Sequence, residues 1–100
     1  MIIENEIRQQ ITISLDTSFL ELVNESHMHN VPTGSESHFK LTLASDAFTG
    51  KRLVQRHQFV YKVLEQQMPK IHALALHLYT DEEWLQKEKS PSSPQCMGGE

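Results

Sequence analysis

Cysteine, long apolar runs and excess basic charge are all scarce in this sequence of 100 residues. Cys96 is its single cysteine, so an internal disulfide is impossible and a reducing compartment is the expected setting. No apolar run approaches the roughly 18 residues that indicate a membrane span. Nine lysine and arginine residues against thirteen acidic residues give a net charge of −4, which exerts no global attraction on nucleic acid. Nucleic-acid binding would therefore need a local basic patch.

The length and composition are those of one modest domain. Hydrophobic residues make up 38% of the chain and charged residues 22%, as is usual for a soluble globular protein. A domain of this size buries only about two-thirds of its unfolded surface, which favours clefts and edges over a deep active site. We therefore expect a binding module and not an enzyme. The start MIIENEIRQQ lacks the basic and apolar parts of a signal peptide, so the cytoplasm is the expected location.

Helical spacing predicts two helices in the first two-thirds of the chain. Ile3, Ile7 and Ile11 recur at every fourth position and form the apolar stripe of a helix over about residues 2–15. A second helix is expected between the turn SDAFTG and Pro69. Its apolar face would consist of six residues: Leu53, His57, Val60, Tyr61, Leu64 and Met68.

Apolar segments rich in strand formers predict three strands, over residues 19–26, 38–44 and 71–78. A loop over residues 27–37 joins the first two. The second and third are separated by about 25 residues that contain a helix, which is the length of a parallel crossover. These elements predict an α+β domain with a three-stranded mixed sheet covered on one face.

A final helix is predicted from Thr80 onward. Thr80 and Glu83 have the spacing of a capping box, and Trp84 and Leu85 would anchor this helix to the core. The remaining segment SPSSPQCMGGE is rich in serine, proline and glycine. The expected organisation is therefore one domain over residues 1–89 and a disordered C-terminal tail over residues 90–100.

Six histidines are more than a chain of this length usually has, and two of them stand in the segment KIHALALHLYT. A parallel third strand would bring His72 to the end of the sheet where the 27–37 loop enters the second strand, near His29 or His27. Two imidazoles there would be half of a metal site, because structural zinc needs four ligands, and a partner would supply the rest. The alternative is that His72 forms a hydrogen bond at a strand end and His29 is solvated. His77 would lie on the opposite face from His72.

Lys51, Arg52 and Arg56 cluster at the start of the predicted second helix. Basic side chains at a helix N-terminus can bind phosphate, so this cluster is a candidate nucleic-acid surface. The alternative is a solvated basic helix face, because a KH-type domain would hold nucleotides with a GXXG loop and FTGKR has only Gly50. Ser45 and Asp46 have no catalytic motif around them, and Cys96 is an unconstrained thiol.

Several blocks together carry a resemblance to a known family. The run HNVPTGSESHFKLTLASDAFTGKRLVQRHQFVY, then IHALALHLYTDEEW and the tail SPQCMGG, resembles the BolA family, and in particular its bacterial members. The resemblance extends from the first helix to the tail. It implies an αββααβ core similar to class II KH domains, followed by a C-terminal helix.

The resemblance also implies a function. Members of the family act as transcriptional regulators in the stress response, with direct contact to promoter DNA proposed, and here the Lys51, Arg52 and Arg56 segment would make that contact. They also form complexes with monothiol glutaredoxins and share a 2Fe-2S cluster, for which the implied ligands are His72 and the loop residue His29, with His27 as the alternative. The glutaredoxin cysteine and a glutathione thiolate complete the set, so the isolated chain is not expected to hold the cluster tightly. Cluster trafficking without DNA binding is the alternative function, and the choice between monomer and weak homodimer stays open.

Overall fold

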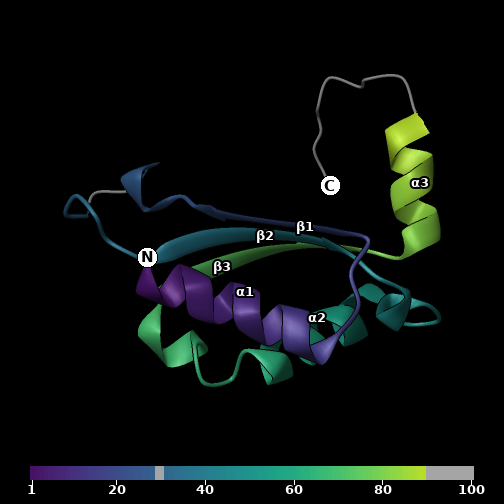
Figure 1. Cartoon of the computed structure of the whole chain (residues 1–100), viewed down its shortest axis with the longest axis horizontal. Coiled ribbons are helices and arrows are strands. Elements are labelled where there is room, and N and C mark those ends of the chain that lie inside the picture. The colour runs from purple at the N-terminus through teal and green to yellow at the C-terminus, as the bar shows by residue number, and fades with distance from the viewer. Residues whose placement is uncertain (29–30, 90–100) are drawn as a thin grey trace.

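A three-stranded sheet forms the centre of the computed structural model, which describes residues 1–28 and 31–89 (Figure 1). The elements follow the order α1 (Ile2–Ser14), β1 (Phe19–Asn24), β2 (His38–Ala44), α2 (Leu53–Val63), β3 (Ala73–Tyr79) and α3 (Asp81–Lys89). β2 is central, antiparallel to β1 and parallel to β3. The α+β class, the mixed sheet and the parallel crossover are confirmed. No helix in the described ranges is long and apolar enough to cross a membrane.

The helices α1 and α2 lie together on one face of the sheet (Figure 1). Ile7 and Ile11 of α1 are fully buried, as their spacing predicted, and they pack with Phe39, Leu41 and Leu43 of β2. Alternation along β2 directs these three side chains to the helices and leaves the residues between them on the other face. The core therefore lies between the sheet and these two helices.

The second helix is shorter than predicted, and only part of its predicted apolar face is buried in the core. α2 ends at Val63, and the crossover contains this one α-helix between two 3₁₀ turns, Asp46–Phe48 and Met68–Lys70, where the αββααβ pattern has two consecutive helices. Leu53 and Tyr61, predicted to be apolar core residues, are 64% and 41% exposed. Arg56 and Val60 are the buried positions of this helix. The predicted face was right in part, because Val60 and Leu64 are fully buried and Met68 packs against the core, whereas Leu53 and Tyr61 lie at its solvent edge.

Two strand boundaries also differ from the prediction. β1 ends at Asn24, and the chain continues into a 3₁₀ turn, Ser26–Met28. β3 begins at Ala73, so His72 directly precedes the strand and is not its second residue. Pro69 explains the later start, because it lies in the 3₁₀ turn that still occupies the chain up to Lys70. The strand could begin only after this turn.

The other face of the sheet is open except at one end, where α3 stands against it (Figure 1). The Trp84 ring stacks on Phe19 with centroids 4.4 Å apart and lies 5.3 Å from Tyr79. The predicted capping box is present, because Glu83 accepts from the Thr80 N–H and Thr80 Oγ1 accepts from the Glu83 N–H. Leu85 is 49% exposed, so of the two predicted anchors only Trp84 packs α3 against the sheet. The predicted tail, residues 90–100, and His29 lie outside the described residues.

Candidate functional site

His72 is fixed at the junction between the incoming chain and β3. Its backbone N–H donates to the Ser37 carbonyl oxygen at 2.8 Å, and the Ala73 N–H donates to the same oxygen at 3.1 Å. The parallel register pairs His38 with Ala73, so the start of β2 lies beside the start of β3. The His72 side chain is exposed. An exposed imidazole on a well-anchored backbone is available to a ligand or a partner.

The histidine that the structure places against His72 is His38, the first residue of β2. The two ring centroids are 5.0 Å apart and the ring planes are inclined by 45°. His38 Nδ1 is hydrogen bonded to Ser37 Oγ at 2.8 Å. Alternation along the strand predicts only that His38 lies on the face opposite Phe39, Leu41 and Leu43, and gives it no role. The parallel crossover could have identified it, because it brings the first residues of both strands to one end of the sheet.

The predicted partners of His72 in the loop are not placed beside it. His27 is exposed in the 3₁₀ turn Ser26–Met28 and lines a depression with loop residues 31–35, to which His72 does not contribute. His29 lies outside the described residues, so its proximity to His72 stays a prediction. Within the described ranges no group of three or more histidine, cysteine, aspartate or glutamate side chains could hold a metal ion.

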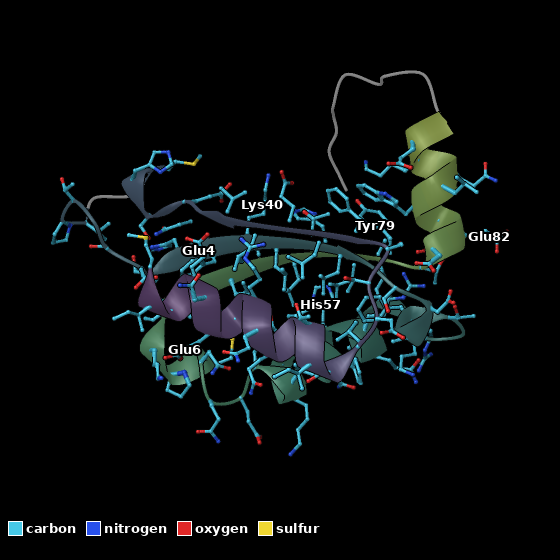
Figure 2. The ribbon with its side chains drawn as sticks, in the orientation of Figure 1. Glu4, Glu6, Lys40, His57, Tyr79 and Glu82 are labelled. Carbon is cyan, nitrogen blue, oxygen red and sulfur yellow. The ribbon has the colours of Figure 1, made fainter. Side chains whose placement is uncertain are left out.

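His77 is separate from this site. It pairs with Thr42 in the middle of the sheet and is half-buried. Alternation along β3 places it on the open face, the face on which Figure 2 shows Lys40 and Tyr79. The expectation that His72 and His77 are not a ligand pair agrees with this placement.

The basic candidates lie at the turn that leads into α2. Gly50 has a φ of 81°, a left-handed conformation that glycine adopts without strain, and it turns the chain toward Lys51 and Arg52. Arg52 is exposed at the N-cap position, where its backbone N–H donates to Gln55 Oε1 at 2.8 Å. Lys51 is half-buried, with Nζ 5.8 Å from the centroid of the Phe59 ring. Lys51 and Arg52 therefore form an ordered basic turn.

Arg56 does not belong to the exposed basic turn, which corrects the sequence-based expectation. It is 7% exposed, and its guanidinium donates to both carboxylate oxygens of Glu83 at 2.7 and 3.0 Å. Nη1 also donates to the Leu78 carbonyl oxygen at 3.2 Å, and Nε donates to the Lys51 carbonyl oxygen at 2.9 Å. The guanidinium thus joins α2 to the end of β3 and to α3. Hydrophobic spacing could not find it, because an arginine was not counted among the residues facing the core.

Carboxylates surround the basic turn. Asp46, Glu82 and Glu83 line the same depression as Lys51 and Arg52, a space of about 450 Å³. The Arg56 hydrogen bonds hold the pKa of Glu83 below its usual range, against a smaller opposing effect of burial. The hydrogen bond and charge of Asp81 raise the pKa of Asp46. To bind a phosphate here, Lys51 and Arg52 would have to attract it more strongly than the surrounding carboxylates repel it.

Replacing Asp46 with asparagine is expected to stabilise the protein at neutral pH. The raised pKa means that the folded state binds this proton more tightly than the unfolded chain, so the wild type loses stability as pH rises through the folded pKa. The substitution removes that loss, because an asparagine side chain cannot ionise beside Asp81. Thermal unfolding followed by circular dichroism should show a gain for Asp46→Asn that is larger near pH 7 than near pH 3.5. Glu21→Gln, at an exposed position of β1 that lines neither depression next to Asp46, is the control; an equal gain in both variants would contradict the prediction.

Ser45 has a structural role. It is 1% exposed, and its hydroxyl donates to the Asp16 carbonyl oxygen and accepts from the Ala47 N–H. The side chain therefore closes the turn after β2, and both of its hydrogen bonds are made to the backbone. Neither contact prepares it as a nucleophile.

The sheet order, the parallel crossover and the histidine-bearing junction define a small α+β domain, and comparisons place it in a family. Residues 11–83 match the family model described as BolA-like protein, and the chain belongs to this family. It is 48% identical to a Vibrio cholerae protein and 45% identical to an Escherichia coli protein, each named DNA-binding transcriptional regulator BolA. The first alignment covers 97% of this chain and 93% of the relative, and the second covers 98% and 95%.

Solved structures agree with the fold. The solution structure of BolA1 protein from Mus musculus matches with a TM-score of 0.78 at 37% identity, over 96% of this chain and 79% of that one. The BolA domain of SufE1 from Arabidopsis thaliana matches with a TM-score of 0.74 at 36% identity, over 80% and 93%. The predicted family is therefore confirmed, and so is the three-stranded mixed sheet.

Proposed function

We propose that this chain is a DNA-binding transcriptional regulator of the stress response. The observation that carries the proposal is near-complete alignment, at 45 to 48% identity, with two bacterial relatives that are named as DNA-binding transcriptional regulators. The basic turn supports it, because Lys51 and Arg52 stand together at the N-terminus of α2. A helix N-terminus with basic side chains attracts phosphate, and such contacts position a protein on the duplex without reading its sequence.

Charge reversal at the basic turn is expected to weaken DNA binding. The double variant Lys51→Glu/Arg52→Glu should lower the affinity for a promoter fragment by at least about tenfold at low salt. It should also reduce the slope of log K against log salt by about 2, because two phosphate contacts are lost. Fluorescence anisotropy over a salt series would measure both quantities.

A control with the same change in net charge separates local contact from global charge. Lys62→Glu/Lys87→Glu alters two other lysines, one at the end of α2 and one on α3. We expect a smaller loss of affinity for this variant. Equal losses for the two pairs would show that the basic turn is not the contact surface. Equal affinity of the wild type for promoter and random duplex would contradict a sequence-specific regulator.

We further propose that the chain shares a 2Fe-2S cluster with a monothiol glutaredoxin, with His72 as one ligand. The exposure and firm backbone anchoring of His72 support this, as does the absence of a self-sufficient metal site within the described ranges. The partner cysteine and glutathione would supply thiolates. Histidine in place of thiolate on one iron raises the potential of such a cluster. Cluster trafficking without DNA binding is the variant of this proposal that applies if the promoter experiment fails.

We propose that the protein acts in the cytoplasm. The cluster proposal is therefore tested by reconstitution under conditions that match those of the cytoplasm. The chain, a monothiol glutaredoxin, glutathione, iron and sulfide are combined, and the visible absorption and circular dichroism spectra are compared with those of the glutaredoxin alone. A new histidine-ligated spectrum and a mixed complex on size exclusion are expected. Identical spectra with and without the chain would contradict cluster sharing.

A further inference from the structure

The His38 and His72 rings have the separation of two imidazoles on one metal ion. A nitrogen bound at about 2.1 Å places its ring centroid about 3.2 Å from the ion, so two rings on a tetrahedral ion have centroids about 5 Å apart. The observed separation is 5.0 Å, with the rings inclined at 45°. A stacked aromatic pair would instead have nearly parallel planes. The arrangement is therefore compatible with a chelate across the β2 and β3 strand starts.

The surroundings of His38 resemble the outer shell of a metal ligand. A ligating histidine generally donates its second ring N–H to a fixed acceptor, which orients the ring. Here Ser37 Oγ lies 2.8 Å from His38 Nδ1, so a metal ion would be bound through Nε2. Ser37 Oγ is in turn 3.4 Å from Ser26 Oγ, which also accepts the backbone N–H groups of Ser37 and His38. Ser26 is buried, so this support is built into the fold.

The two histidines are also held in register by the backbone. His72 N–H donates to the Ser37 carbonyl oxygen, and His38 pairs in the parallel ladder with Ala73, the residue that follows His72. The Ser37 residue thus contacts both candidate ligands, one through its hydroxyl and one through its carbonyl. The backbone that carries both imidazoles is therefore already ordered before an ion binds.

We propose that the chain by itself binds one divalent transition-metal ion between His38 and His72, with water completing the coordination. Imidazole nitrogen suits zinc, nickel, cobalt and copper, and two protein ligands leave open positions on the ion. This site needs no glutaredoxin and no glutathione, so its test is independent of the test of the cluster proposal. An ion bound there would occupy His72 and so exclude it from a shared cluster.

Zinc titration of the full-length chain tests the site. Isothermal titration calorimetry with ZnCl₂, in a Cys96→Ser background that removes the thiol as a competing ligand, should show one ion per chain. His38→Asn and His72→Asn should each weaken binding by more than tenfold. Ser37→Ala, which removes the hydroxyl contacts with His38 and Ser26 but keeps the backbone carbonyl, should weaken it by about tenfold. His77→Asn and His57→Asn should leave the affinity unchanged, because both histidines are remote from the junction.

A second measurement covers variants that lose stability. In the protein that keeps all its histidines, zinc should shift the imidazole ¹⁵N resonances of His38 and His72 and leave those of His57 and His77 unchanged. No zinc binding, binding that His38→Asn does not weaken, or shifts confined to other histidines would each overturn the proposal.

Discussion

His72→Ala is expected to abolish the histidine-ligated cluster spectrum of the mixture with monothiol glutaredoxin, glutathione, iron and sulfide. In the proposed cluster, alanine removes one of the four protein and glutathione ligands. The fold should persist, because the side chain is exposed and the backbone N–H that donates to Ser37 is retained. Visible absorption and circular dichroism measure the loss, and thermal unfolding of the isolated variant checks the fold.

His77→Ala is the matched control for this experiment. It removes a histidine from the same segment, but one that pairs with Thr42 in the middle of the sheet. The His77 variant should reproduce the wild-type spectrum. If His72→Ala also reproduced it, His72 would not be a ligand. If both variants lost it, the spectrum would report on the integrity of β3 and not on a ligand.

Arg56→Leu is expected to destabilise the protein by about 3 kcal/mol, because two carbonyl oxygens lose their donor and each unsatisfied buried acceptor costs about 1 to 3 kcal/mol. These acceptors belong to Leu78 and Lys51, and the Leu78 contact is buried. Glu83 loses its partner as well, but its side chain is 47% exposed and water can solvate it. Urea unfolding followed by Trp84 fluorescence measures the change.

Glu83→Gln separates the ion pair from the carbonyl contacts. Its effect should be smaller, about 1 kcal/mol, because the carboxylate is nearly half exposed and screened by solvent. The contribution of Glu83 is fully present above its unfolded pKa and is lost as pH falls through its lowered folded pKa. The difference between wild type and Glu83→Gln should therefore shrink toward about pH 3. Equal losses for Arg56→Leu and Glu83→Gln would contradict the importance of the carbonyl contacts.

Arg56 also bears on the proposed DNA binding, although it is buried. Its Nε contact with the Lys51 carbonyl oxygen holds the basic turn against the start of α2. The contact with Glu83 links the same turn to α3. Loss of DNA affinity on substitution of Arg56 would thus report on positioning of Lys51 and Arg52 and not on a direct contact with phosphate.

Local patterns in the sequence were sufficient for most of the fold. The spacing of Ile3, Ile7 and Ile11 predicted α1, and alternation predicted β2 with its bounds, because both depend on which side chains face the core. The Thr80 and Glu83 capping box is equally local, since its two hydrogen bonds join residues within a single helical turn. The length of the crossover was enough to predict that β3 is parallel to β2, and with it the end of the sheet at which His72 lies.

Local patterns did not decide which side chains meet at that end of the sheet or which are buried; the tertiary structure did. His38 faces His72 because the parallel register sets the starts of β2 and β3 side by side, a relation between residues far apart in the sequence that no local pattern encodes. Arg56 is buried because Glu83 and the Leu78 carbonyl satisfy its guanidinium, whereas its neighbours in sequence indicated an exposed basic face. In both cases the sequence by itself determined the type of residue and the element that carries it. The contacts that give each residue its role came from the packing of distant elements.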